Sequence, residues 1–95
     1  MPDMADPYML PARLDVSAAQ GLVTHLLSVP AQEPTILDAS ETQHLGALCA
    51  QALLAAGRRC TEEGGSLQIL NASERIETQL DTMGLSIHSL TEGQA

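Results

Sequence analysis

The side chains best suited to catalysis or ligand binding lie in one segment, which reads TILDASETQHLGALCAQAL from Thr35 to Leu53. Asp38 follows a short apolar run and Glu41 comes soon after it, so the two could form a carboxylate pair or bind a cation. No further oxygen ligands follow at a useful spacing, and we therefore predict no metal site. His44 is a candidate pH-sensitive contact, because imidazole titrates near neutral pH.

The remaining nucleophiles form no recognised catalytic motif. Cys49 and Cys60 fall eleven positions apart on one expected helix, about 16 Å and too far for a disulfide. Both are expected to be small apolar side chains in the core. Gly64-Gly65 lacks the Lys and the Ser or Thr of a phosphate-binding loop, and it follows a helix instead of preceding one. The sequence predicts neither an enzyme nor a cofactor.

The composition narrows the class of partner. The 95 residues suit one domain with a modest core. Twelve acidic residues against four basic ones give a net charge of −8, which would repel nucleic acid. Tyr8 is the only aromatic residue, which disfavours a large permanent interface, so we expect a monomer or a weak homodimer. The longest apolar stretch is too short for a bilayer and the start lacks the basic region of a signal peptide, which predicts a cytoplasmic protein without membrane insertion.

Hydrophobic periodicity predicts alternating strands and helices. Strands are expected at 8–10, 35–37 and 66–70. The first helix is capped by Asp15 or Ser17, the second runs over 45–63 and stops at Gly64-Gly65, and the third starts at Asn71. Ile87 and Leu90 form a short edge element. The buried positions expected in the first two helices are Ala19, Leu22, Val23, Leu26 and Leu27, then Leu45, Leu48, Cys49, Ala52, Leu53 and Ala56.

This order predicts a small α/β sandwich, in which helices pack on a mainly parallel or mixed sheet of four to five strands. Residues 8–90 are expected to form the single domain. Residues 1–7 are expected to be a flexible N-terminus and residues 91–95 a flexible tail.

The segments LPARLDVSAAQGL, TILDAS and GGSLQILNASERIETQLDTMGL, with a helix between the last two, resemble the STAS domain of bacterial anti-sigma factor antagonists. The resemblance covers Tyr8 to Leu90 and implies a STAS-like sandwich. It also implies a binding module that docks on a kinase-like anti-sigma factor and is released when one serine is phosphorylated. The family's Asp-Ser-Ser-Gly at the start of the second helix matches Gly46-Ala47-Leu48-Cys49 here, so Leu48 stands in place of that serine.

A leucine cannot accept a phosphoryl group, and the resemblance therefore implies a docking surface without the phosphorylation switch. That surface comprises Asp38, Ser40, Thr42, His44, Gly46, Ala47 and Leu48. A shifted alignment would give the role of phosphorylation site to Ser40 or Thr42. The short chain and the segment HLGALCAQALLAA are similar to stand-alone STAS proteins of alphaproteobacterial chemotaxis clusters, which implies a chemotaxis signalling protein as partner. Two alternatives stay open: a STAS subunit of a lipid-asymmetry ABC transporter, and a nucleotide-binding STAS domain.

Overall fold

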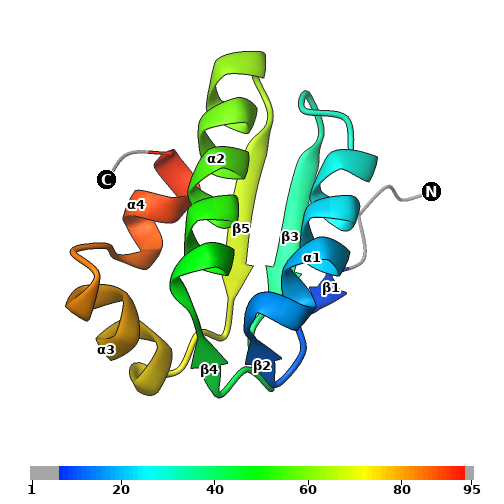
Figure 1. Ribbon diagram of the computed structural model, residues 1–95. Coiled ribbons are helices and arrows are strands. Elements are labelled where there is room, and N and C mark those ends of the chain that lie inside the picture. Colours follow the sequence, from blue (N-terminus) through cyan, green and yellow to red (C-terminus); the bar gives the residue numbers. More distant parts are fainter. Residues whose placement is uncertain (1–6, 94–95) are drawn as a thin grey trace.

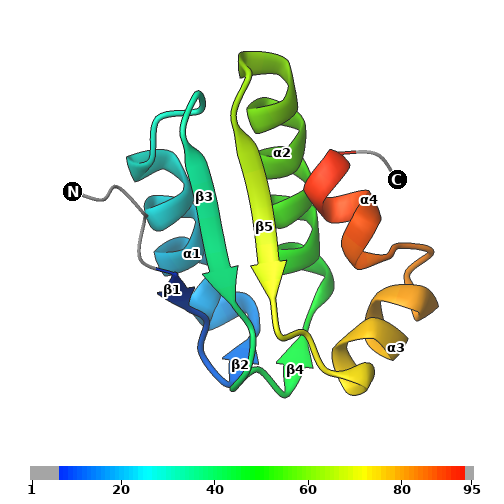
Figure 2. The same ribbon diagram turned by 180° about the vertical axis from the view of Figure 1, so that it is seen from behind.

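The computed structural model describes residues 7–93 and shows an α/β fold with parallel strands. Strands β1 (Tyr8–Met9), β3 (Pro34–Asp38) and β5 (Ser66–Leu70) form a sheet in the order β1-β3-β5. Helices α1 (Val16–Ser28) and α2 (Ala47–Glu63) lie side by side on one face of this sheet (Figure 1). In Figure 2 the sheet stands in front of them, and no helix of the described chain covers its other face.

A second, two-stranded parallel ribbon lies beyond the carboxyl ends of β3 and β5. It consists of β2 (Arg13–Leu14) and β4 (His44–Leu45), with Leu14 opposite Leu45. Both leucines are buried. The expected single sheet of four to five strands is thus wrong: the strands divide into sheets of three and two. Strands of two residues are too short to show the alternation by which a strand is recognised in a sequence.

Helix α1 begins where the sequence predicts. The carboxylate of Asp15 accepts hydrogen bonds from the backbone N–H of Ser17 (3.1 Å) and Ala18 (3.3 Å), and Asp15 is therefore the N-cap. Its buried face consists of Ala19, Leu22 and Leu26. Val23 and Leu27, also expected in the core, are 38% and 64% exposed. The apolar stripe of α1 is wider than the strip that the sheet covers.

Helix α2 ends as predicted, at Gly64 in the left-handed conformation (φ 88°). It begins at Ala47 instead of Leu45, because Leu45 belongs to β4. The buried residues of α2 are Cys49, Ala50, Leu53, Leu54, Gly57 and Cys60. This face is turned by one position from the expected one, since that expectation took its phase from Leu45. As a result Leu48, expected to be buried, is 53% exposed.

The last two helices complete the fold. Helix α3 (Glu74–Thr82) is capped by Ser73, whose hydroxyl accepts from the N–H of Ile76 at 3.2 Å. Asn71 precedes it in the left-handed region (φ 60°), so the prediction that Asn71 starts this helix is wrong. The expected edge element is helix α4 (Ile87–Glu92), and the spacing of its two apolar residues is that of a helical face.

Helix α4 packs on α2, with Leu90 fully buried. Gly57 permits this close approach, because a Cβ atom there would overlap the carbonyl oxygen of Leu90. Helix α4 runs through Glu92 to Gly93, so the tail predicted from residue 91 is wrong for 91–93. Residues 94–95 and residues 1–6 of the expected flexible N-terminus lie outside the described residues. Within residues 7–93 no helix combines the length and apolarity needed to cross a bilayer.

Candidate functional site

The residues singled out in the sequence lie on the loop after β3, on β4 and on the first turn of α2. These segments gather at the end of the molecule where β3 and β5 terminate (Figure 1). Open parallel sheets bind their ligands at this end, because the loops that follow successive strands meet there. The arrangement therefore brings the expected site residues to one end of the fold.

Asp38 shapes the loop after β3. Its carboxylate accepts a hydrogen bond from the backbone N–H of Ser40 at 2.8 Å and another from the side-chain amide of Asn71 at 3.3 Å. The backbone bond from Ser40, followed by the side-chain bonds from Ser40 and Asn71, lowers the pKa of Asp38 from its ordinary value. Asp38 thus joins the loops that follow β3 and β5.

The two hydroxyl groups of this loop lie in different environments. Ser40 is exposed. Thr42 is only 2% exposed, and its hydroxyl donates a 3.0 Å hydrogen bond to the carbonyl oxygen of Pro11. Thr42 therefore fastens the loop to the segment before β2, and its side chain is not available to a partner or to a kinase.

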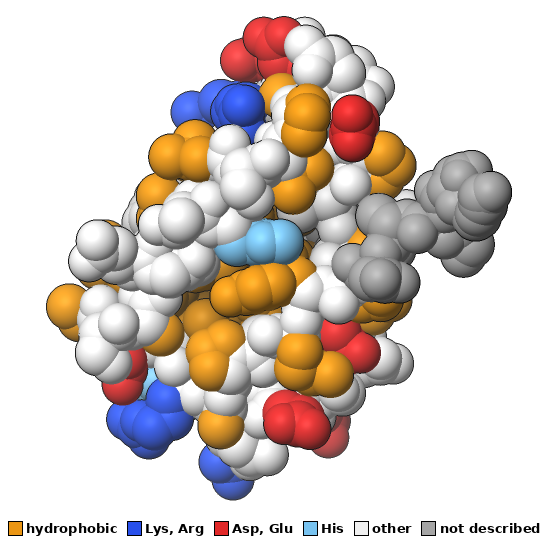
Figure 3. Space-filling model, turned by 90° about the vertical axis from the view of Figure 1, so that its right-hand side faces the viewer, with side chains coloured by type: hydrophobic (Ala, Val, Ile, Leu, Met, Phe, Trp, Pro, Cys, Tyr) orange, Lys and Arg blue, Asp and Glu red, His pale blue; other side chains and the backbone are white. Residues whose placement is uncertain are grey.

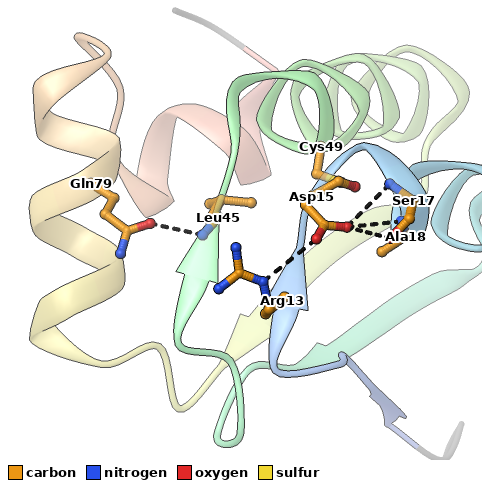
Figure 4. Close-up of polar contacts among 7 residues, drawn as sticks. All are labelled: Arg13, Asp15, Ser17, Ala18, Leu45, Cys49 and Gln79. Carbon is orange, nitrogen blue, oxygen red and sulfur yellow. Dashed lines mark hydrogen bonds and ion pairs between the residues drawn. The ribbon is translucent and has the colours of Figure 1, made fainter.

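The segment that enters α2 is held by a residue that sequence reasoning missed. The side-chain oxygen of Gln79, on α3, accepts from the N–H of Leu45 at 2.7 Å (Figure 4). Its amide nitrogen donates to the carbonyl oxygen of Gln43 at 3.2 Å. One carboxamide thus pairs with β4 as the peptide of a neighbouring strand would. Gln79 follows Ile76 by three positions, and a polar residue on a buried helix face is a signal that could have identified it.

A second set of contacts ties the starts of α1 and α2 together (Figure 4). The Ser17 hydroxyl, the strongest of several hydrogen-bond donors, lowers the pKa of Asp15, and Arg13 adds an exposed ion pair at 3.5 Å. The thiol of Cys49 donates to the backbone carbonyl of Asp15 at 3.5 Å. Burial, reinforced by the charge of Asp15, raises the pKa of Cys49, which disfavours the nucleophilic thiolate.

The start of α2 presents two exposed residues and carries no polar cap. The N-cap is Gly46, which provides no side-chain hydrogen bond, and the turn contains no acidic residue. Ala47 and Leu48 both face solvent, and His44, half-buried on β4, lies close to Gly46. Leu48 also borders a hollow of about 320 Å³ together with Val23 and Ala52. The site therefore presents an apolar side chain beside the unpaired N–H groups of a helix start.

The geometry brings together part of the predicted set. Asp38 and Ser40 share a hydrogen bond, Ala47 and Leu48 are exposed beside the half-buried N-cap Gly46, and Thr42 is buried. Across residues 7–93 no three His, Cys, Asp or Glu side chains are grouped to hold a metal ion. Comparisons of the chain with protein-family models, with curated proteins and with solved structures gave no match.

Proposed function

We propose that this chain is a non-catalytic protein–protein interaction module of the STAS type in bacterial signal transduction. The observation that carries the proposal is Leu48, a leucine 53% exposed on the first turn of α2. A large apolar side chain in water at a helix start, with a hollow beside it, gives a partner an apolar anchor. The proposed docking surface consists of Asp38, Ser40, His44, Gly46, Ala47 and Leu48, without the buried Thr42.

The same residue supports an interaction that serine phosphorylation does not control. Leu48 has no hydroxyl group, whereas a phosphoserine at a helix start would add about two negative charges to an interface. Ser40 is the only exposed hydroxyl between Asp38 and Leu48 in the structure, and it lies in the loop before the helix. Partner binding would then be controlled by the partner's own state or by its concentration.

The negative net charge of the chain favours a partner with a basic surface. With a net charge of −8, association is fastest with a protein whose docking surface is basic. A kinase-like anti-sigma factor or a chemotaxis signalling protein is the proposed partner. In this proposal the protein works in the cytoplasm and binds neither nucleic acid nor a cofactor.

The test compares proteins captured from the native cell lysate by the tagged wild type, by Leu48→Asp and by Ala47→Glu. The matched control is Gln68→Asp, which places the same charge on the open face of the sheet, at an exposed position whose strand partner is Ile36, outside the docking surface. We expect one signalling protein to be captured by the wild type and by the control but lost from both α2 variants. Equal capture by all four proteins would refute the docking surface.

Incubation with the captured kinase and ATP tests the loss of the switch. The mass of the chain should remain unchanged, and a gain of one phosphate on Ser40 would contradict the proposal. Capture of an ABC transporter ATPase and permease would favour the lipid-transport alternative. Micromolar binding of GTP or ATP in calorimetry would favour the nucleotide-binding one.

A further inference from the structure

The outer face of α1 and α2 carries more apolar surface than the fold uses. Of the apolar residues of α1, Val16, Val23 and Leu27 remain in solvent, and Val16 is 76% exposed. The opposite apolar side of α1, which includes Ala19, Leu22 and Leu26, is already buried in the core. Helix α2 runs beside α1 (Figure 1), and Val23 and Leu27 line a hollow together with residues of α2.

A hollow of about 160 Å³ lies between the two helices on this face. Its lining is apolar apart from one arginine at the far end and consists of Val23, Leu26, Leu27, Ala52, Ala55, Ala56 and Arg59. The small alanines of α2 form its far wall and the larger residues of α1 form its near wall. Larger side chains therefore protrude on the α1 side of the hollow, and the alanines leave room for another side chain on the α2 side.

This face carries no acidic residue, and Arg59 is the one charged side chain that lines its hollow, although the protein is strongly acidic. Helix α1 contains no Asp, Glu, Lys or Arg, and α2 contains none before Arg58. Figure 3 shows the neighbouring side of the molecule, at right angles to the α1–α2 face: hydrophobic side chains lie over its middle, and acidic and basic side chains lie toward its upper and lower parts. The net charge of −8 is therefore carried by other parts of the chain.

We propose that the α1–α2 face binds a second copy of this chain in a symmetric dimer. A basic partner would require acidic groups at the rim of the hollow, and this face has none, whereas two copies of this face meet without carboxylates in contact. A twofold axis makes such an interface self-complementary, because the protruding Leu27 of each copy enters the alanine-lined side of the other.

The size of the face predicts a weak dimer. The 13 residues of α1 extend about 20 Å, and two packed helices span about 20 Å across. Two faces of this size bury on the order of 1,000 Å² in total, at the lower end of specific interfaces. The dimer therefore forms reversibly and is populated at high protein concentration.

The electrostatics give this dimer a recognisable signature. Two chains of charge −8 repel each other over distances beyond the interface, and salt screens this repulsion. Sedimentation equilibrium at about 20 mM and about 500 mM NaCl should therefore show tighter association at high salt. The mass should rise from 10.0 kDa toward twice that value as the protein concentration approaches about 1 mM. A wild type that stays monomeric at high salt, or that associates more weakly there, would overturn the proposal.

Variants locate the interface. Leu27→Glu should weaken association at least about tenfold, because it places two carboxylates in the apolar contact. Thr24→Glu adds the same charge at an exposed position of this face without removing an apolar side chain, and it should act in the same direction. Leu70→Glu, with the same net charge, lies on the open sheet face and should leave the dimer intact. Dimers that persist in both α1 variants would place the interface elsewhere.

Leu27 does not border the hollow that contains Leu48, whereas Thr24 does. The Leu27→Glu test is therefore separate from the test of partner docking at Leu48, and either proposal can fail without the other.

Discussion

Replacing Leu48 by aspartate should abolish partner binding while leaving the domain folded. Leu48 occupies the second position of α2, after the N-cap Gly46 and Ala47. The substitution removes the apolar anchor and puts a charge on the proposed docking surface. The variant tests partner binding only if it still folds, and this depends on how far its free energy of unfolding falls.

Two opposing effects determine the stability of this variant. Full burial of a leucine contributes roughly 1.5–3 kcal/mol, and Leu48 is just under half covered, so about 1 kcal/mol is lost. An aspartate in the first turn of a helix gains about 0.3–1 kcal/mol from the positive end of the helix dipole. The free energy of unfolding should therefore fall by less than about 1 kcal/mol, a small part of the 5–15 kcal/mol typical of a domain.

The assay is urea unfolding followed by far-ultraviolet circular dichroism, with Leu53→Asp as the comparison. Leu53 lies on the same helix but is only 1% exposed, so its replacement buries an unpaired charge and should unfold the domain. A wild-type spectrum and a nearly unchanged midpoint for Leu48→Asp, beside an unfolded Leu53→Asp, would support the reasoning. If both variants unfold, Leu48 belongs to the core and must be removed from the docking surface.

Three further predictions concern the fold. Gly57→Ala should destabilise the domain by about 1–3 kcal/mol in urea unfolding, because the new Cβ atom overlaps the α4 backbone. Gly21→Ala should instead stabilise it by about 0.5–1 kcal/mol, because a Cβ atom at this helical position meets no other atom. Gln79→Met should cost about 1–3 kcal/mol in the same assay, since two backbone groups lose their partner. The pKa values of Asp15 and Asp38 are lowered in the folded protein, so their ionised forms add stability. This stability is fully present above the unfolded pKa near 3.8 and is lost as pH falls through the folded pKa values. When both residues are replaced by Asn, unfolding measured below about pH 4 should depend less on pH.

The parts of the fold that the sequence predicted correctly depend on local chemistry. Asp15 at a helix start and Gly64 at a helix end act through the adjacent backbone, so their residue types suffice to identify them. The positions of the three main strands along the chain follow from apolar runs between these helix-start and helix-end residues. The ribbon of β2 and β4 depends on the pairing of residues thirty-one positions apart, and no local pattern specifies that pairing.

The candidate site was predicted less completely, for a related reason. The buried hydroxyl of Thr42 and the carboxamide of Gln79 gain their roles from backbone groups distant in the chain. Their residue types are common in loops and on helix surfaces, so neither stands out without the structure. Asp38 was assigned to the carboxyl end of a strand, where it lies, but its hydrogen bond from Asn71 required the neighbouring loop.

The three leucine and valine positions that the periodicity placed wrongly in the core are Val23, Leu27 and Leu48. They are not scattered over the molecule: Val23 borders both hollows between α1 and α2, Leu27 lines one of them and Leu48 lines the other. Apolar residues that follow the helical repeat but exceed what the sheet covers are typical of a surface that is buried in a complex. The misplaced positions thus point to the same helical face that carries both proposed interactions, with the partner at its Leu48 end and the second copy over Leu27.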